Sequence, residues 1–214
     1  MSEYTGQQTV HSDGSDYNAM EFLVNSIINK LATTMLVKVI AVSNNGEVSP
    51  VGTVDVQPAV HQTDGIGQTT EHGIINGLPY FRLQGGATAV ILDPKVGDIG
   101  VAVFCSRDIS AVKATKDVGG PGSRRKYDWA DGVYIGLCLG DAPTQYVRFH
   151  DDEIEIKCNT KVTVTSPIVS LSGALQVAGE VTAMFGGASV TLSHHVHGTG
   201  SPTAAGTVVP SPGT

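Results

Sequence analysis

Thr191-Leu192-Ser193-His194-His195-Val196-His197-Gly198 lies near the end of the 214-residue chain and decides how the rest of the sequence is interpreted. His195 and His197 are two positions apart, so in an extended backbone their imidazoles project to the same side, as ligands of one metal ion must. Two nitrogens do not complete a coordination sphere, and residues 181–214 contain no Asp, Glu, Lys or Arg. Three copies of the chain on a threefold axis would supply six nitrogens, an octahedral set suited to iron or another first-row transition metal.

A solvated polar tail is the alternative for this stretch, because a His-x-His pattern alone is weak evidence of a metal site. The preceding residues favour the metal. Through residues 146–192, apolar side chains alternate with polar ones in short segments that Pro and Gly interrupt. The alternating apolar residues are Ile154, Ile156, Cys158, Val162, Val164, Val169, Leu171, Leu175, Val177, Val181, Ala183, Val190 and Leu192.

Each of these segments offers two or three apolar side chains on one face, and no helix in the same region could cover them. At about 25 cal/mol per Å², a few half-exposed valines would not offset the cost of ordering the backbone of one chain. Three chains wound round a common axis would bury all of these faces. The pattern therefore predicts an intertwined trimeric β-shaft with the same axis as the histidines. A monomeric β-solenoid would need a regular repeat length, and this region has none.

Residues 35–145 predict a small Greek-key barrel of the OB type. Short β-rich runs are separated by turns, one of which contains Asn45-Gly46, a pair suited to positive φ. The runs occupy residues 36–42, 52–60, 78–84, 90–92 and 99–105. A Gly- and Pro-rich loop follows over residues 106–132, and we expect Trp129 to pack it onto the barrel. Residues 132–140 are either a last barrel strand or the exit from the domain.

The N-terminal region predicts a polar arm followed by one amphipathic helix, with Asp16 as its N-cap. Six apolar residues recur at helical spacing, which gives the helix a wide apolar stripe. These are Met20, Leu23, Val24, Ile27, Ile28 and Leu31. The stripe either packs on its own domain or contacts a neighbouring copy or partner protein.

The composition argues against nucleic-acid binding. The net charge is −7 and the only dense basic cluster is Arg124-Arg125-Lys126, whereas a nucleic-acid binder carries a basic face. Three widely spaced cysteines, Cys105, Cys138 and Cys158, predict reduced thiols packed in cores. The first residues have neither a basic start nor an apolar run, so we expect no signal peptide. No apolar stretch reaches the roughly 18 residues that span a bilayer.

We expect no enzymatic activity. Asp151, Asp152 and Glu153 are more simply a solvated strand entry than an acid/base pair. An iron oxygenase or cupin would need two histidines and a carboxylate around an open site, and no acidic residue follows Glu180.

With helix, barrel, shaft and terminal motif in this order, the chain resembles the central spikes of contractile phage tails, the baseplate assembly protein V family. The order of parts covers nearly the whole chain, and the family's S-L-x-x-H-x-H-G tip matches residues 191–198, with Thr191 in place of Ser. The resemblance implies a homotrimer beneath the tail-tube hub whose point holds one iron ion by His195 and His197 of three chains. His194 has no counterpart among the ligands. Strict alternation continued from Val190 would place His194, and not His195, on the inward side. The resemblance therefore requires the alternation to shift by one residue before His195.

The prediction is a mainly β chain of four parts. These are an N-terminal arm and helix (1–34), an OB-like barrel (35–145), a trimeric β-helix or β-prism shaft (146–192) and a metal-binding tip (193–214). The expected function is a spike that pierces the host outer membrane, assembled in the host cytoplasm into the virion baseplate. A spike of an R-type bacteriocin or type VI secretion system, or a trimeric tail fibre or adhesin, is the alternative. The sequence leaves open whether further ions lie on the shaft axis.

Overall fold

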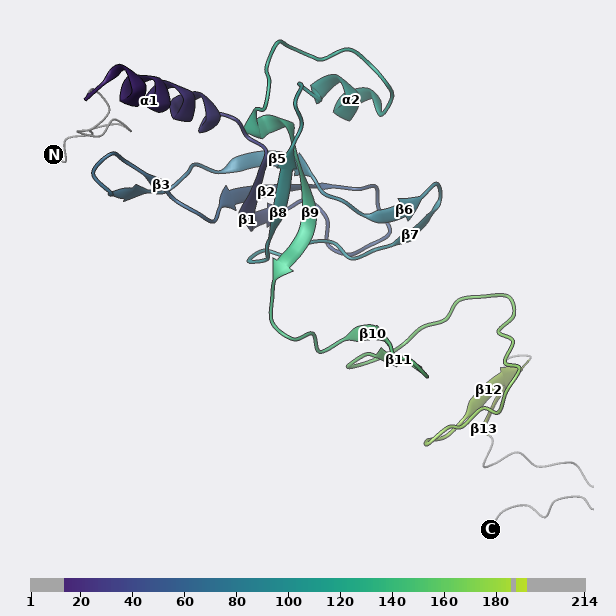
Figure 1. Ribbon diagram of the computed structural model, residues 1–214. Coiled ribbons are helices and arrows are strands. Elements are labelled where there is room, and N and C mark those ends of the chain that lie inside the picture. The colour runs from purple at the N-terminus through teal and green to yellow at the C-terminus, as the bar shows by residue number, and fades with distance from the viewer. Residues whose placement is uncertain (1–13, 186–187, 192–214) are drawn as a thin grey trace, which may run out of the picture. The chain divides into compact units, whose positions relative to one another are not determined.

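The computed structural model of the chain describes residues 14–185 and 188–191. The fold is mainly β, with an N-terminal helix and a central sheet (Figure 1). Contacts between residues divide the chain into two compact units, Met1–Pro143 and Thr144–Thr214. The boundaries predicted at residues 34, 145 and 192 stay predictions. Among the described residues, no helix is both long and apolar enough to cross a bilayer.

Helix α1 runs from Asp16 to Ile28. Its N-cap is Ser15 and not Asp16, since the Ser15 hydroxyl accepts a hydrogen bond from the Asn18 backbone N–H at 3.2 Å. Asp16 occupies the first turn, where its negative charge is favourable near the positive end of the helix dipole. The predicted helix is therefore confirmed, and its predicted cap is wrong by one residue.

A five-stranded antiparallel sheet forms the centre of the first unit, in the order β5-β2-β1-β8-β9. Its strands are β1 (Thr34–Val42), β2 (Thr53–Pro58), β5 (Ile75–Pro79), β8 (Ile99–Phe104) and β9 (Gly132–Leu139). Buried and partly exposed residues alternate along β8, as expected of a strand with one face on a core. Tyr80, directly after β5, forms a parallel bridge with Tyr134 of β9, and the Phe81 N–H donates to the Tyr134 carbonyl at 2.7 Å. The two edges of the sheet therefore meet at this bridge.

The core lies against this sheet. Its fully buried large side chains include Val37, Val39, Val54, Val56, Leu78 and Tyr134. Gly100 permits the close approach of β8 to β9, because a Cβ there would overlap the Gly136 carbonyl oxygen and the Tyr134 hydroxyl. Burial raises the pKa of Tyr134 to about 12.

The connections of the first unit carry two small hairpins, β3–β4 (Gln62–Thr63 and Thr69–Thr70) and β6–β7 (Leu83–Gly85 and Thr88–Val90). The loop predicted over 106–132 also contains a short helix, α2 (Ser110–Thr115), and the 3-10 helix η1 (Trp129–Asp131). The Gly and Pro residues that predicted a plain loop follow α2 and do not interrupt it. Trp129 packs against the core and its ring lies 4.9 Å from that of His72, which confirms the expected contact.

The second unit contains two hairpins. Strands β10 (Tyr146–Phe149) and β11 (Ile154–Lys157) form the first, and β12 (Thr182–Phe185) and β13 (Ala188–Thr191) form the second. Residues 158–181, all of which the structure describes, contain neither helix nor strand. The β segments expected between residues 162 and 177 therefore form no strands with any part of the described chain.

The three cysteines are free, as predicted, but they do not all lie in cores. Cys105 is partly buried, whereas Cys138 and Cys158 are exposed. The prediction of buried thiols is therefore wrong for these two in the single chain, because wide spacing of cysteines indicates that they are unpaired but carries no information on burial.

Candidate assembly surface

The β10–β11 hairpin has two chemically different faces. Successive side chains of a strand point to opposite sides, so the register sorts the cross-strand pairs into two sets. The pairs Val147–Ile156 and Phe149–Ile154 share one face, and the pairs Tyr146–Lys157 and Arg148–Glu155 share the other. One face is thus wholly apolar and the other polar.

The side chains of the polar face form hydrogen bonds and ion pairs with one another. The Tyr146 hydroxyl donates to Glu155 Oε1 at 3.0 Å, and Arg148 Nη2 lies 2.7 Å from Glu155 Oε2. The cationic groups of Arg148 and Lys157 each lie 5.7 Å from the centre of the Tyr146 ring. Exposed ion pairs of this kind stabilise weakly, but they leave this face complete in contact with water.

The apolar face of the hairpin is uncovered. Its four side chains expose between 57% and 74% of their surface, with Phe149 the most exposed. An isolated two-stranded hairpin is marginally stable in water, and stability requires its apolar face to be covered. A contiguous exposed apolar patch of this kind marks an interaction site.

The uncovered surface continues along the chain beyond the hairpin. Seven large apolar side chains between residues 162 and 177 expose from 49% to 80% of their surface. They are Val162, Val164, Ile168, Val169, Leu171, Leu175 and Val177. Residues 162–179 contain no charged side chain, and their backbone groups form no strand ladder within the described chain. The apolar side chains of this run are therefore uncovered, and its backbone lacks strand partners within the described chain.

The predicted metal ligands, His195 and His197, lie outside the described residues. So does the expected shift of the alternation before His195, since the last described strand, β13, ends at Thr191. Within residues 14–185 and 188–191, no three His, Cys, Asp or Glu side chains come together as a metal site. A site that takes two ligands from each of three chains would not be complete within one chain.

The acidic residues considered for catalysis lie in the turn between β10 and β11. Asp151, Asp152 and Glu153 are all exposed. The backbone N–H of His150 donates to the Glu153 carbonyl at 2.8 Å, which closes the turn. These carboxylates are exposed to solvent, as predicted, and lie in the turn that leads into β11.

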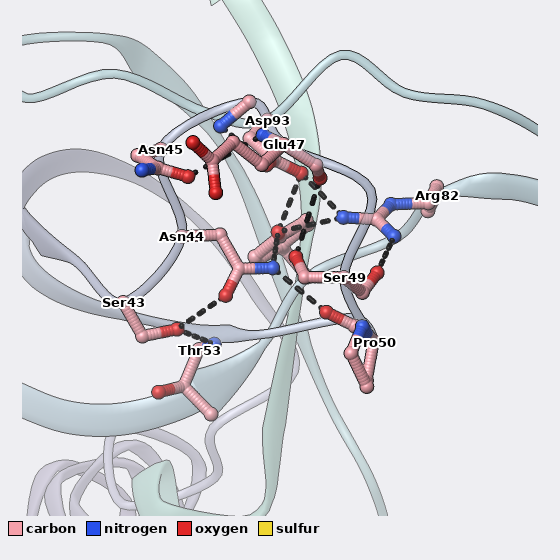
Figure 2. A network of polar contacts seen from close by, with 11 residues as sticks. Ser43, Asn44, Asn45, Glu47, Ser49, Pro50, Thr53, Arg82 and Asp93 are labelled. Atoms are coloured by element: carbon pink, nitrogen blue, oxygen red, sulfur yellow. Dashed lines mark hydrogen bonds and ion pairs between the residues drawn. The ribbon is translucent and has the colours of Figure 1, made fainter.

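A buried polar cluster in the first unit was not predicted from the sequence (Figure 2). Arg82 Nη2 and Asp93 Oδ1 lie 2.7 Å apart, and the two side chains expose only 3% and 4% of their surface. The Tyr80 hydroxyl donates to Asp93 Oδ1 at 2.6 Å, while Asn44 Nδ2 donates to the Tyr80 hydroxyl at 2.9 Å and to the Pro50 carbonyl at 2.8 Å. The cluster thereby fixes the loop between β1 and β2 to the chain that follows β5.

Asp93 is held in its charged form by this cluster. Burial raises the pKa of the Asp93 carboxyl, but the hydrogen bonds from Tyr80, Arg82 and the Gly46 N–H, together with the Arg82 charge, outweigh it. The pKa therefore lies below its ordinary value. Because every one of these contacts joins residues from different loops, the cluster acts as a clamp on this end of the unit.

Replacing Asp93 with Asn should destabilise the first unit by about 3–5 kcal/mol, because Arg82 would remain buried without its counter-ion. Trp129, the only tryptophan of the chain, lies against the core and reports unfolding of this unit by its fluorescence in urea. Asp141→Asn, a substitution of an exposed carboxylate, is the matched control and should change the free energy of unfolding by less than about 0.5 kcal/mol. Equal unfolding midpoints for the two variants would show that the buried pair is not needed.

A second polar cluster anchors the long loop that precedes β9. Arg125 Nη2 lies 3.0 Å from Asp108 Oδ1 and 2.9 Å from Asp131 Oδ1. Hydrogen bonds from Ser110 and Ser123, and the Arg125 charge, hold the pKa of the Asp108 carboxyl far below its ordinary value. Arg125 belongs to the one dense basic cluster of the sequence, and its pairing with two buried carboxylates leaves that cluster even less suited to binding phosphate.

Comparison of the chain with protein-family models and with curated proteins finds no match. Function is therefore inferred from the terminal His-x-His motif and from the uncovered surfaces described above.

Proposed function

We propose that this chain is the central spike of a contractile phage tail baseplate, a homotrimer that pierces the host outer membrane. The observation that carries the proposal is the apolar surface of the second unit, which runs from the β10–β11 hairpin to Val177 and which the described chain leaves uncovered. Two further copies of the same chain supply what this surface lacks.

A threefold arrangement would bury the apolar face of the hairpin and leave its polar face in water. When the face bearing Val147 and Ile156 turns towards a common axis, three copies bury one another's apolar side chains. The face bearing Tyr146, Arg148 and Glu155 then remains in water, where its ion pairs already satisfy it. Residues 162–177 form no strand ladder within the described chain, and the backbone of neighbouring chains wound beside them would pair with them.

The first unit fits the barrel of such a spike. A five-stranded antiparallel sheet whose edge strands meet at Tyr80 and Tyr134 supports an OB-like barrel. In the proposed assembly, three of these barrels sit beneath the tail-tube hub, and the shaft leads away from them. Tail-tube and hub proteins are thus the expected partners besides the two other copies.

The tip would hold a metal ion through His195 and His197 of each chain. Six imidazole nitrogens are a donor set of intermediate softness that suits iron among the first-row metals. The ion would tie together three chain ends and supply no redox or hydrolytic step. Residues 181–214 carry no Asp, Glu, Lys or Arg, which favours passage through hydrocarbon because side-chain charge there is costly.

The proposed function is mechanical. A rigid, interlocked trimer transmits the force of sheath contraction to a narrow point, and metal coordination opposes fraying of that point. A spike of an R-type bacteriocin or of a type VI secretion system has the same design, and membership of such a particle is the alternative function.

Light scattering joined to elemental analysis of the purified chain tests the proposal. We expect a mass of three chains per particle and about one transition-metal ion per trimer, as the ligand count requires. A folded, metal-free monomer would overturn the proposal, because neither the apolar surface nor the histidine pair would then have a partner.

A further inference from the structure

Helix α1 presents an apolar stripe to solvent. Tyr17, Met20, Val24 and Ile27 follow one another at steps of three, four and three residues, the spacing of a coiled-coil seam, and Leu31 lies four residues on, just past the end of the helix. They expose between 44% and 76% of their surface. Leu23 and Ile28 flank this seam and are exposed to 60% and 54%. The described helix has no buried residue at all.

The opposite side of the helix is its less exposed side. Asn18, Phe22 and Ser26 are four residues apart, which places them on one face, and all three are partly buried. The helix therefore turns its apolar stripe away from the described part of its own chain. Of the two interpretations that the sequence allowed, packing of the stripe on its own domain is not what the structure has.

The helix is attached firmly at its C-terminal end. Ala32 is buried in the core of the first unit, and its N–H donates to the Tyr127 carbonyl at 3.1 Å. An isolated helix of this length is marginal in water, so its stability must come from packing of the apolar stripe. The described part of the chain leaves this stripe uncovered, and another copy of the helix is a partner that could cover it.

We propose that α1 helices of three copies pack together as a parallel three-helix coiled coil, the seam residues forming its core. This inference rests on the proposed homotrimer, which supplies two identical helices at high local concentration. In heptad terms, Tyr17 and Val24 take one core position and Met20 and Ile27 take the other. The β-branched Ile27 and the flanking Leu23 and Ile28 favour three helices over two, because a two-helix seam leaves flanking positions half exposed.

The size of the stripe agrees with this arrangement. Seven apolar side chains, each with roughly 50 Å² to bury, amount to about 1,000 Å² over three helices, near the lower limit of a specific interface. Asp16 and Glu21 lie beside the seam, where like charges of neighbouring helices oppose association. The coil is therefore expected to form on the assembled trimer and not to drive assembly alone.

Another apolar surface on the described part of the first unit could receive the helix. An apolar groove of about 400 Å³ lies on the first unit between the chain after β5 and the exposed half of β9, and it includes Phe81, Leu83, Leu92, Ile135 and Leu137. An identical helix matches the seam by symmetry, and we take it as the expected partner. The groove is thus the competing destination of α1 in the experiment.

Cysteine cross-linking in the full-length chain tests the inference. Met20→Cys lies in the seam and Asn25→Cys on the polar side of the same helix; both positions are exposed, so neither substitution should disturb folding. After mild oxidation, Met20→Cys should give linked pairs that approach about two-thirds of all chains, because only two of three thiols can join on one axis. Asn25→Cys should stay at the level of the parent chain, whose own three cysteines set the background.

A further variant separates the two destinations. Met20→Cys combined with Leu137→Cys should still give pairs only; covalently closed trimers would mean that α1 lies in the groove of the neighbouring copy, and would overturn the coil. The mass measured by light scattering on the same samples distinguishes failure of the coiled coil from failure of the proposed spike. A trimer in which Met20→Cys links no more than Asn25→Cys would refute the coil and leave the spike intact, whereas a monomer would refute the spike.

Discussion

Ile156→Asp is expected to convert the assembled chain into monomers. In the proposed trimer, Ile156 lies on the apolar face of the hairpin, opposite Val147, and turns towards the common axis. Three carboxylates would be brought together in a dry interface, each at a cost of several kcal/mol. The dissociation constant should rise by at least about a thousandfold, since 1.4 kcal/mol corresponds to a factor of ten. Sedimentation or light scattering at micromolar concentration measures the change.

Lys157→Asp is the matched control for this experiment. It introduces the same side chain at the next residue, on the polar face that includes Tyr146 and Arg148. That face remains in water in the proposed trimer, so this variant should keep the mass of the parent chain. Trp129 fluorescence should show a folded first unit in both variants, because the hairpin belongs to the other unit. If both variants stayed trimeric, the apolar face of the hairpin would not be the interface.

The alternation of apolar and polar residues predicted much of this surface. It assigned Ile154 and Ile156 to one side of a strand, and the register of β11 with β10 has them there. Alternation predicts which side of a strand is apolar. It does not predict whether that side is buried by the same chain or by another chain. Cys138 and Cys158 show the difference, since both were predicted to be buried and both are exposed in the single chain.

The buried polar cluster was beyond prediction for a different reason. Asn44 and Tyr80 are 36 positions apart, and Tyr80 and Asp93 are 13 apart, with turns and strands between them. Local propensity carries no information about such pairs, because their cost or benefit depends on burial and on partners from other loops. Asp93 in the sequence is simply a charged residue before Pro94, where a turn is the natural expectation.

The N-terminal helix lies between these two cases. The spacing of Met20, Val24 and Ile27 predicted its apolar stripe, and the structure confirms both the helix and the stripe. The direction in which the stripe points depends on how Ala32 joins the core, which is a tertiary contact. Sequence periodicity therefore predicted which face of the helix is apolar, but it did not predict what that face contacts.

Joint replacement of His195 and His197 by Ala is expected to remove the metal and loosen the tip. Each chain would lose both of its proposed ligands, so metal content should fall from about one ion per trimer to below about a tenth. Coordination of a structural metal contributes to folding free energy on the order of 10 kcal/mol. The thermal midpoint of the tip should therefore fall by at least about 10 °C, measured by calorimetry alongside elemental analysis.

His194→Ala separates coordination from the general effect of losing an imidazole. His194 has the same chemistry and is adjacent to His195 in the sequence, but the resemblance gives it no part in the ligand set. This variant should keep both the metal content and the thermal midpoint of the parent chain. The double variant, in which His195 and His197 are both Ala, should remain a trimer, because the apolar surface from Val147 to Val177 does not depend on the ion. Loss of metal on His194→Ala, with retention in the double variant, would assign the metal to His194 in place of His195 and His197.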